Sequence, residues 1–384
     1  MDRRKFFKVL GVSGAGIAAG SLAASPLSAM QSLAPQETPE TNINEALKWP
    51  RTETSMPGKF RGKVVKVTDM KSVDSNDQPV DSVAYDMVAK GLLLLTGEKN
   101  LNKAWRQFVS PEDRIGLKVN PIGGPVLSTS HAVTGAIIRQ LEESGIPRRN
   151  IVIWDRRQEE LTAAGFTEEK YPGIRIAATE TKENDSFYGK DGNLLSLNNI
   201  DKDWAYYADV EEEYDAYTLP YMTNQGKYSY FTKICTQELD KIINVPIMKN
   251  AGAAVTLCLK NLAFGSITNT SRLHKYHWHH ACAQVCAFPP LRDKVVLNIA
   301  DGLRGCYDGG PGANPQFLCS YNTILVGTDA VAVDRMGHDI IIGRRIAEGR
   351  QREDSEKGII KLKMAQEYGL GTADKASIEL IEAQ

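Results

Sequence analysis

The sequence predicts an α/β protein with a mostly parallel β-sheet that is covered by helices on both faces. Two observations predict it. At least five strand-like runs of apolar and β-branched residues alternate with segments of helical periodicity, and such alternation is typical of parallel sheets buried on both faces. One complete strand–helix–strand unit also lies within Arg114–Asp155. We therefore expect a Rossmann-like arrangement in a single domain over residues 61–384.

The first predicted unit is a strand at Gly62–Thr68, followed by a helix at Asp81–Leu95 whose apolar residues recur at helical spacing. The clearest unit then has strands at Ile115–Val119 and Ile151–Trp154 on either side of a helix at Ser130–Ser144, a crossover that we expect to be right-handed. The later elements are strands at Lys241–Val245, Val295–Ile299 and Thr323–Val326, with helices at Ala253–Leu262 and Asp329–Arg345.

Two segments lack this regularity. Residues 31–60 are polar and contain several prolines, which predicts a linker or a wrapping arm. Residues 159–233 are irregular and rich in tyrosine. We interpret them as a long insertion over one end of the sheet, serving either as a lid or as an oligomer contact.

The N-terminus predicts export. Arg3 and Arg4 precede two phenylalanines and an apolar, glycine-rich stretch, the pattern of a twin-arginine signal peptide over residues 1–30. The apolar stretch is shorter than the roughly 20 residues that a membrane span needs. We expect a periplasmic or other extracytoplasmic protein that meets the twin-arginine translocase and has no membrane span once mature; the cleavage site stays open.

Charge and cysteine content exclude several classes of protein. Without residues 1–29 the formal charge is −4, so no nucleic-acid partner is expected. The six cysteines include no CxxC pair, so no iron–sulfur cluster is expected. Cys306 and Cys319 could form a disulfide outside the cytoplasm, but folding before export, in a reducing compartment, weighs against it.

Polar residues follow the first strand of the crossover. Lys118 and Asn120 end that strand, and a glycine-containing loop leads to Ser128 near the next helix. Ligands bind beyond the carboxyl ends of strands in such sheets, so these three residues are predicted to bind an anion. A capped turn without a ligand explains the same residues.

A second polar cluster follows the strand at Lys241–Val245. It contains Lys249, Lys260 and Asn261. Partial burial lowers the pKa of a lysine and suits it to base or Schiff-base chemistry, so Lys249 and Lys260 are candidate catalytic residues and Asn261 a candidate ligand contact. The alternative is that both lysines extend over the sheet edge into solvent.

Four blocks in this order resemble the domain of unknown function 362 family: Ile243–Lys249, Leu259–Gly265, Ala300–Gly302 and Gly327–Asp334. The resemblance extends from about Ile115 to Arg345. It implies a fold and the location of a site more than a reaction. Many relatives add cysteine-rich iron–sulfur segments that this chain lacks, and a glycine-rich loop in the family matches Tyr307–Gly312, which we expect to be a turn near the site.

Carboxylates also follow the later strands. Asp301 comes after the strand at Val295–Ile299 and is a candidate catalytic acid. Asp329 is a candidate ligand contact, or a cap for the helix that begins there. Asp334 lies five positions farther on and need not share a helix face with Asp329.

A third cluster holds four of the six histidines and two of the cysteines. On a helix His279, Cys282 and Cys286 would share one face, and imidazole with thiolate suits zinc or another transition metal. The alternative is a set of hydrogen-bonded histidines with cysteines in the core.

Together these patterns predict an enzyme that acts on an anionic small molecule, with a metal or other cofactor. The alternatives are a non-catalytic periplasmic protein that binds a metal or ligand, and an accessory subunit of an exported redox complex.

Overall fold

The computed structural model describes residues 38–211, 218–223, 226–251, 254–275, 277–350 and 355–384 of the chain. The predicted signal peptide at residues 1–30 lies outside the described residues, as do part of the predicted linker and short stretches of the predicted insertion. Within the described residues, no helix is both long and apolar enough to span a bilayer.

The main sheet has the strand order β13-β1-β12-β10-β7-β2-β3-β4. The run from β10 through β7, β2 and β3 to β4 is parallel, whereas β12 is antiparallel to both of its neighbours. β8 extends the sheet by pairing with the far half of β10. The bounds are β1 Lys63–Thr68, β2 Ile115–Lys118, β3 Ile151–Arg157, β4 Arg175–Glu180, β7 Lys241–Asn244, β8 Ile247–Ala251, β9 Ala254–Thr256, β10 Val295–Gly310, β11 Leu318–Cys319, β12 Thr323–Gly327 and β13 Glu379–Ala383.

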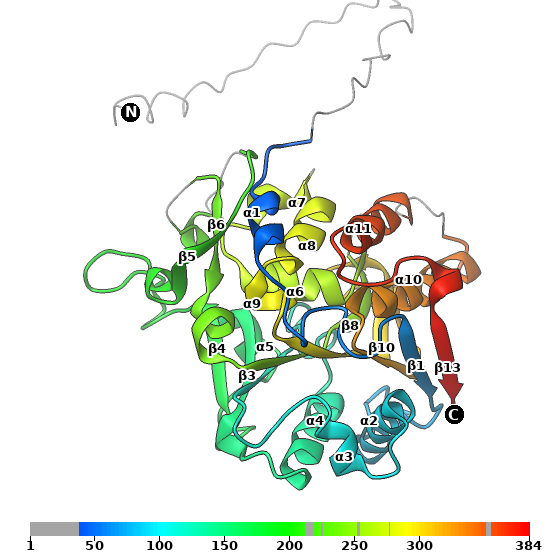
Figure 1. The fold of residues 1–384 in the computed structure, drawn as a ribbon. Helices are drawn as coiled ribbons and strands as arrows, with labels where there is room; N and C mark the ends of the chain where they lie inside the picture. Colours follow the sequence, from blue (N-terminus) through cyan, green and yellow to red (C-terminus); the bar gives the residue numbers. More distant parts are fainter. Residues whose placement is uncertain (1–37, 212–217, 224–225, 252–253, 276, 351–354) are drawn as a thin grey trace, which may run out of the picture. The chain divides into compact units, whose positions relative to one another are not determined.

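Helices cover both faces of this sheet, as predicted (Figure 1). One layer contains α2 Asp81–Thr96, α3 Leu101–Trp105, α4 His131–Glu143 and α5 Gln158–Ala163. The opposite layer contains α6 Cys258–Ser266, α7 Ser271–His274, α8 Trp278–Cys286, α9 Pro289–Arg292, α10 Ala330–Ala347 and α11 Ser355–Glu367.

Strand β3 shows why the sequence specifies two layers. Successive side chains of a strand point to opposite faces. Ile151 and Ile153 accordingly lie in the core beneath α2–α5, while Val152 and Trp154 lie in the core beneath α6–α11. Burial of each such side chain contributes about 1.5–3 kcal/mol, so an apolar strand without alternation is stable only when both faces are covered.

Three expectations need correction. The helix predicted at Ala253–Leu262 begins at Cys258, because residues 254–256 form β9 and pair with β8. The strand predicted at Val295–Ile299 continues to Gly310, so most of the predicted turn at Tyr307–Gly312 is extended strand.

The insertion predicted at residues 159–233 is also more regular than expected. Its β4 joins the main sheet, and β5 Ile200–Tyr207 pairs with β6 Tyr228–Thr232 in a separate two-stranded sheet. The predicted linker contains a short helix, α1 Ile43–Lys48, with Ile43 and Ala46 buried. It is therefore a packed arm where the structure describes it.

Candidate functional site

A cavity of about 170 Å³ lies beyond the carboxyl ends of the parallel strands β2 and β3, beside α6. Parallel α/β sheets place their ligands at this edge. The volume is below the roughly 300–1,000 Å³ of pockets for drug-sized ligands, which favours a small metabolite. The lining residues are Asn120, Ile122, Asp155, Arg156, Lys249, Ala251, Thr256, Lys260, Asn261, Phe264, Gly265, His274 and Pro311.

Lys118 lies behind this cavity in a complete hydrogen-bonding environment. Its Nζ donates to the Val119 carbonyl (2.8 Å), to Asn261 Oδ1 (3.1 Å) and to the Asp155 carboxylate. Three acceptors match the three protons of an ammonium group. The pair of Lys118 and Asp155 is fully buried, so Asp155 is already neutralised and contributes little negative charge to the cavity.

A row of asparagines continues from Lys118 across the strand ends. Asn261 Nδ2 donates to the Lys118 carbonyl (3.1 Å) and to Asn244 Oδ1 (2.8 Å). Asn244 Nδ2 donates to Asn298 Oδ1 (2.9 Å), and Asn298 Nδ2 donates to the Thr328 carbonyl (3.1 Å). Each amide is buried and satisfied, so this row fixes α6 against the strands. Asn261, a predicted ligand contact, therefore makes most of its possible hydrogen bonds to the scaffold.

Lys249 lies at the inner wall of the cavity and is fully buried. Its Nζ donates to Asn120 Oδ1 (3.0 Å) and to the Ile122 carbonyl, with no ion-pair partner among the described residues. Burial lowers the pKa of Lys249 to about 7. This hydrogen bond joins Lys249 and Asn120, two predicted site residues from different parts of the sequence.

Lys260 lies on the first turn of α6 and is only partly buried. Its Nζ lies over the rings of Phe264 (4.9 Å to the centroid) and Trp278 (5.7 Å). Within the described residues it has neither a hydrogen-bond partner nor an ion-pair partner, and burial lowers its pKa. A cation in this state gains the most from an anionic ligand.

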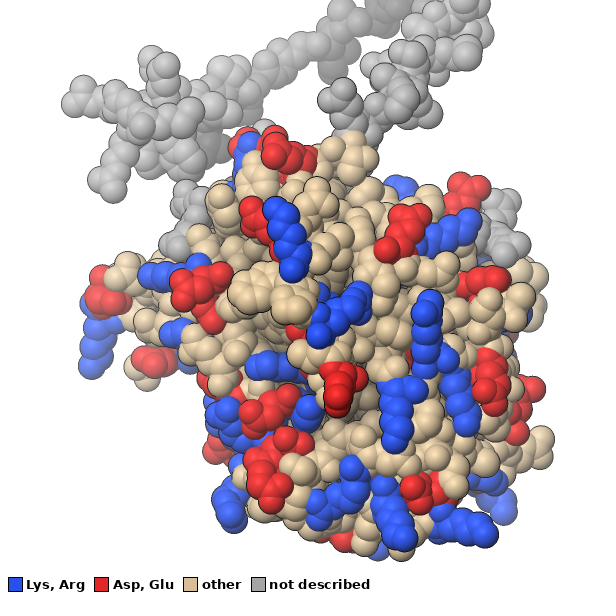
Figure 2. All heavy atoms as spheres, in the orientation of Figure 1, with Lys and Arg blue, Asp and Glu red and all other residues tan. Residues whose placement is uncertain are grey.

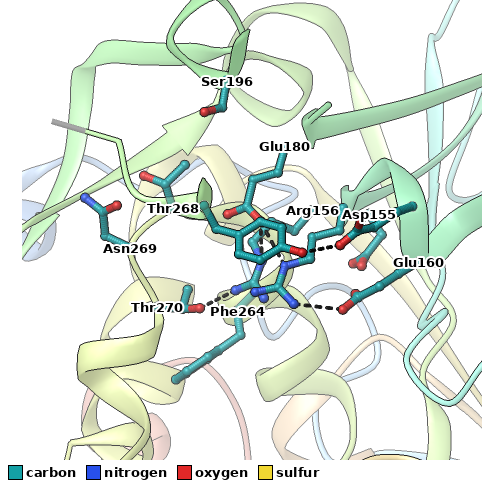
Figure 3. Close-up of polar contacts among 12 residues, drawn as sticks. Asp155, Arg156, Glu160, Glu180, Ser196, Phe264, Thr268, Asn269 and Thr270 are labelled. Carbon is teal, nitrogen blue, oxygen red and sulfur yellow. Dashed lines mark hydrogen bonds and ion pairs between the residues drawn. The ribbon is translucent and has the colours of Figure 1, made fainter. Parts of the chain in front are cut away.

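Arg156 adds a third basic side chain, which the sequence did not single out. It follows Asp155 on β3, and its guanidinium donates to the Phe264 carbonyl (3.1 Å) and to the Thr270 hydroxyl. The Glu180 carboxylate lies 3.6 Å from Arg156 Nε, and Figure 3 shows both partners turned toward the guanidinium. Glu180 is shared with Arg157 (2.9 Å), and Arg157 also pairs with Glu160 (3.0 Å).

Thr256 and His274 complete the polar lining. Thr256 lies opposite Lys249 in the β8–β9 pair, so both side chains project from the same face. Its hydroxyl is buried and has no partner within the described part of the chain. His274 Nδ1 lies 2.9 Å from the Thr270 carbonyl. A carbonyl can only accept, so Nδ1 carries the proton and Nε2 is an acceptor in the neutral ring.

Three predicted site residues serve the scaffold instead of the cavity wall. Asp301 accepts hydrogen bonds from the backbone of Ser130 (2.7 Å) and Leu303 (3.0 Å), which ties β10 to the start of α4. Asp329 caps α10 by accepting from Ala332 N (2.9 Å), the alternative left open by the sequence. Ser128 donates to the Thr129 carbonyl (3.3 Å). Their carboxylates and hydroxyl satisfy nearby backbone groups before they can serve a ligand.

The predicted metal ligands are not brought together. Cys282 and Cys286 are buried in the core, and the Cys286 thiol donates to the Leu259 carbonyl (3.5 Å). His279 is partly exposed and packs against His280, with 4.4 Å between ring centroids. Among the residues that the structure describes, no group of three or more His, Cys, Asp or Glu side chains is arranged to hold a metal. Helical spacing predicted that His279, Cys282 and Cys286 share one face of a helix. In the structure the two thiols lie in the hydrophobic core, whereas His279 is partly exposed.

The cysteines are all free in the structure. In the antiparallel pairing of β10 with β11, Cys306 lies opposite Leu318 and Cys319 lies opposite Gly305. Adjacent positions of a strand point to opposite faces, so this register separates the two thiols that the sequence allowed as a disulfide.

The face of the molecule in Figure 2 carries charges of both signs. In Figure 2 basic and acidic side chains are interspersed over the face in view. Inside the cavity the basic groups available to a ligand are the cations Arg156 and Lys260 and the titratable amine of Lys249.

Comparisons with known proteins give a family and a distant structural likeness. A family model described as "Domain of unknown function (DUF362)" matches residues 115–339, more than half of the chain. No curated protein matches. A crystal structure of a protein from Thermotoga maritima is similar at 8% sequence identity and a TM-score of 0.34, covering 71% of this chain and 60% of that one. The chain thus spans about three fifths of the length of that protein.

Proposed function

The chain belongs to the domain of unknown function 362 (DUF362) family, and from that premise we propose that it is an enzyme that binds a small anionic molecule in the cavity beside α6. The family description names no reaction, so the proposal rests on the cavity. The observation that carries it is Lys260, a half-buried cation without an ionic or hydrogen-bonding partner in the described residues, on the wall of a cavity with both polar and apolar lining residues.

The charge balance of the cavity supports an anion. Its walls carry the cations Arg156 and Lys260 and the titratable amine of Lys249, against the single carboxylate of Asp155. That carboxylate is bound to Lys118, which lies behind the wall. A carboxylate or phosphate group would supply the charge and the hydrogen-bond acceptors that Lys260 lacks, and charge-assisted hydrogen bonds of this kind are the strong ones.

Lys249 supplies the acid–base group of the proposed enzyme. Its pKa of about 7 allows it to take up and release a proton near neutral pH. Asn120 holds the amine in place, and the neutral His274 offers an acceptor at Nε2. A bound anion would thus lie between a fixed positive charge at Lys260 and a titratable amine at Lys249.

The experiment is a binding screen of small carboxylates and phosphates against the purified mature protein, read by thermal shift and calorimetry. We expect the Lys260→Met variant to lose about tenfold or more in affinity, since a hydrogen bond to a charged group contributes about 1.5–3 kcal/mol. Lys202→Met, at an exposed position on β5, is the matched control. Equal affinities for the two variants would contradict the proposal.

A second function, a non-catalytic binding protein for the same anion, is favoured by one observation. The cavity carboxylate Asp155 is held by Lys118, so the lysine amines and His274 are the groups left to move a proton. Turnover of a bound ligand by wild-type protein but not by Lys249→Met would decide for the enzyme. Binding that is unchanged by Lys249→Met, without turnover, would decide for the carrier.

We also propose that the protein acts outside the cytoplasm after export by the twin-arginine route. The support is the sequence at Arg3 and Arg4 with the apolar stretch that follows. This route carries folded proteins, so the buried cavity would be complete before export.

A further inference from the structure

We propose that the anion is a 2-oxo carboxylate and that Lys249 forms a Schiff base with its carbonyl carbon. This proposal rests on the proposed function and names its substrate class. Arg156 and Lys260 would hold the carboxylate, while the amine of Lys249 would meet the adjacent carbonyl. Each group lines the same cavity.

The hydrogen bonds of Lys249 favour a neutral amine. Nζ has two acceptors, Asn120 Oδ1 at 3.0 Å and the carbonyl of Ile122. A neutral amine has two N–H groups and one lone pair, whereas an ammonium has three N–H groups. Both N–H groups are therefore satisfied with the lone pair left over, and a third proton would have no acceptor among the described residues.

Lys118 shows the opposite pattern a short distance away. Its Nζ has three acceptors, one of them the Asp155 carboxylate. It therefore matches an ammonium that is engaged by the scaffold. The contrast identifies Lys249 as the nucleophilic lysine and Lys118 as a structural one.

The remaining walls suit a short oxo acid. Ile122, Phe264 and Pro311 provide an apolar surface for an alkyl group. The buried Thr256 hydroxyl has no partner in the described chain and lies on the same face as Lys249. It can donate to the carbonyl oxygen as charge develops there. A cavity of about 170 Å³ limits the substrate to a small acid.

The step balances without an oxidant or reductant. The Lys249 lone pair forms a C–N bond to the carbonyl carbon as the C=O π bond breaks, and one proton moves from the nitrogen to the oxygen to give a carbinolamine. Loss of that oxygen as water, with a proton from the nitrogen, leaves the imine. The imine can then withdraw electrons from the neighbouring carbon.

The test is reductive trapping. Mature protein is incubated with glyoxylate, pyruvate or 2-oxobutyrate in the presence of cyanoborohydride, which reduces imines, and is analysed by intact mass and peptide mapping. Lactate, a carboxylate without the carbonyl, is the control ligand. We expect one adduct per chain, on the peptide that contains Lys249, with any of the three oxo acids that is small enough to enter the cavity. We expect no adduct with lactate.

The variants separate the roles. Lys249→Met should reduce adduct formation at least tenfold, and Lys260→Met should require about tenfold or more oxo acid for the same yield. Lys202→Met should react as the wild type does. If Lys249→Met does not fold, the peptide map of the wild type still identifies the modified lysine.

Two outcomes overturn the proposal. Adducts spread evenly over exposed lysines, or no adduct with any of the three acids, would exclude a Schiff base at Lys249. If the oxo acids and lactate still raise the melting temperature, the proposed anion site stands without Schiff-base chemistry. If no carboxylate or phosphate raises it, the proposed function fails as well.

Discussion

The Asp334 carboxylate of α10 accepts a hydrogen bond from the backbone N–H of Leu259 at the start of α6 (3.2 Å). It also accepts from Cys258 N (2.5 Å) and pairs with Lys361 of α11 (3.3 Å). α6 has no side-chain cap of its own, so a residue 75 positions away satisfies its first amides. The helix that carries Lys260 is therefore placed by its neighbours.

Replacing Asp334 with Asn should destabilise the protein strongly. The change leaves buried Lys361 without its carboxylate, and breaking a buried pair costs about 3–5 kcal/mol. Glu348→Gln, which removes the carboxylate from an exposed pair with Arg344, should cost about 0–1 kcal/mol. Chemical denaturation measures both. Adding Lys361→Met to Asp334→Asn should recover part of the loss, and a purely additive loss would contradict this account.

Lys260→Met should leave the unliganded protein as stable as the wild type, or more stable by about 0.5–2 kcal/mol. Lys260 is a half-buried charge without an ionic partner in the described residues, and methionine removes the cost of desolvating it. Thermal and denaturant unfolding without added ligand measure the change. A clear loss of stability would mean that Lys260 stabilises the fold and is not an unpaired group that binds an anion.

The stability contributed by Lys249 should depend on pH in one direction. Its folded pKa of about 7 lies below the value of about 10.4 in an unfolded chain. Between these values the unfolded state binds more protons, so stability rises with pH. The unfolding free energy of the wild type minus that of Lys249→Met should increase from pH 7 toward pH 10 and be flat below pH 7. A difference that falls with pH would show a charged Lys249.

Gly265→Ala should destabilise the site, whereas Gly135→Ala should not. A Cβ at Gly265 would lie 2.1 Å from Lys118 Cε and 2.9 Å from Asp155 Oδ1. Overpacking of this kind costs about 1–3 kcal/mol. A Cβ at Gly135 in α4 would meet nothing within 4 Å, and alanine favours a helix over glycine by about 0.5–1 kcal/mol. Denaturation curves with shifts of opposite sign are expected.

Replacing Arg3 and Arg4 together with lysine should block export and leave the protein in the cytoplasm. In the export route that we propose, a twin-arginine pair is read by a receptor, so the positive charge of lysine does not replace it. Lys8→Arg, outside the pair, is the control. Cell fractionation with immunodetection measures the result, and equal export of both variants would contradict the twin-arginine interpretation.

Most of the fold could be predicted because its signals are local. The predicted boundaries of β2, α4 and β3 agree with the structure to within about three residues. They could be predicted because the hydrophobic period and the capping residues lie within each segment. The start of α6 could not be predicted in this way. Residues 254–256 pair with β8, and that pairing depends on a strand elsewhere in the sheet.

The sequence analysis named the lysines of the candidate site but did not name its arginine, Arg156. Lys118, Lys249 and Lys260 each follow the rule that polar residues after parallel strands meet at one edge. Arg156 directly follows Asp155 in the buried strand β3. A signal was present in the sequence, because these two charged residues come directly after the apolar run Ile151–Trp154. The contact of Arg156 with Thr270 could not be read from the sequence.

The sequence alone predicted that Lys118, Lys249 and Lys260 lie near the carboxyl edge of a parallel sheet, because strand period and the order of elements are local properties. Only the tertiary structure decided which of them is free for a ligand. Lys118 was matched with Asp155, Lys249 with Asn120 and a carbonyl, and Lys260 with two aromatic rings. These partners come from distant segments, and the protonation and reactivity of an amine depend on the partners that packing provides.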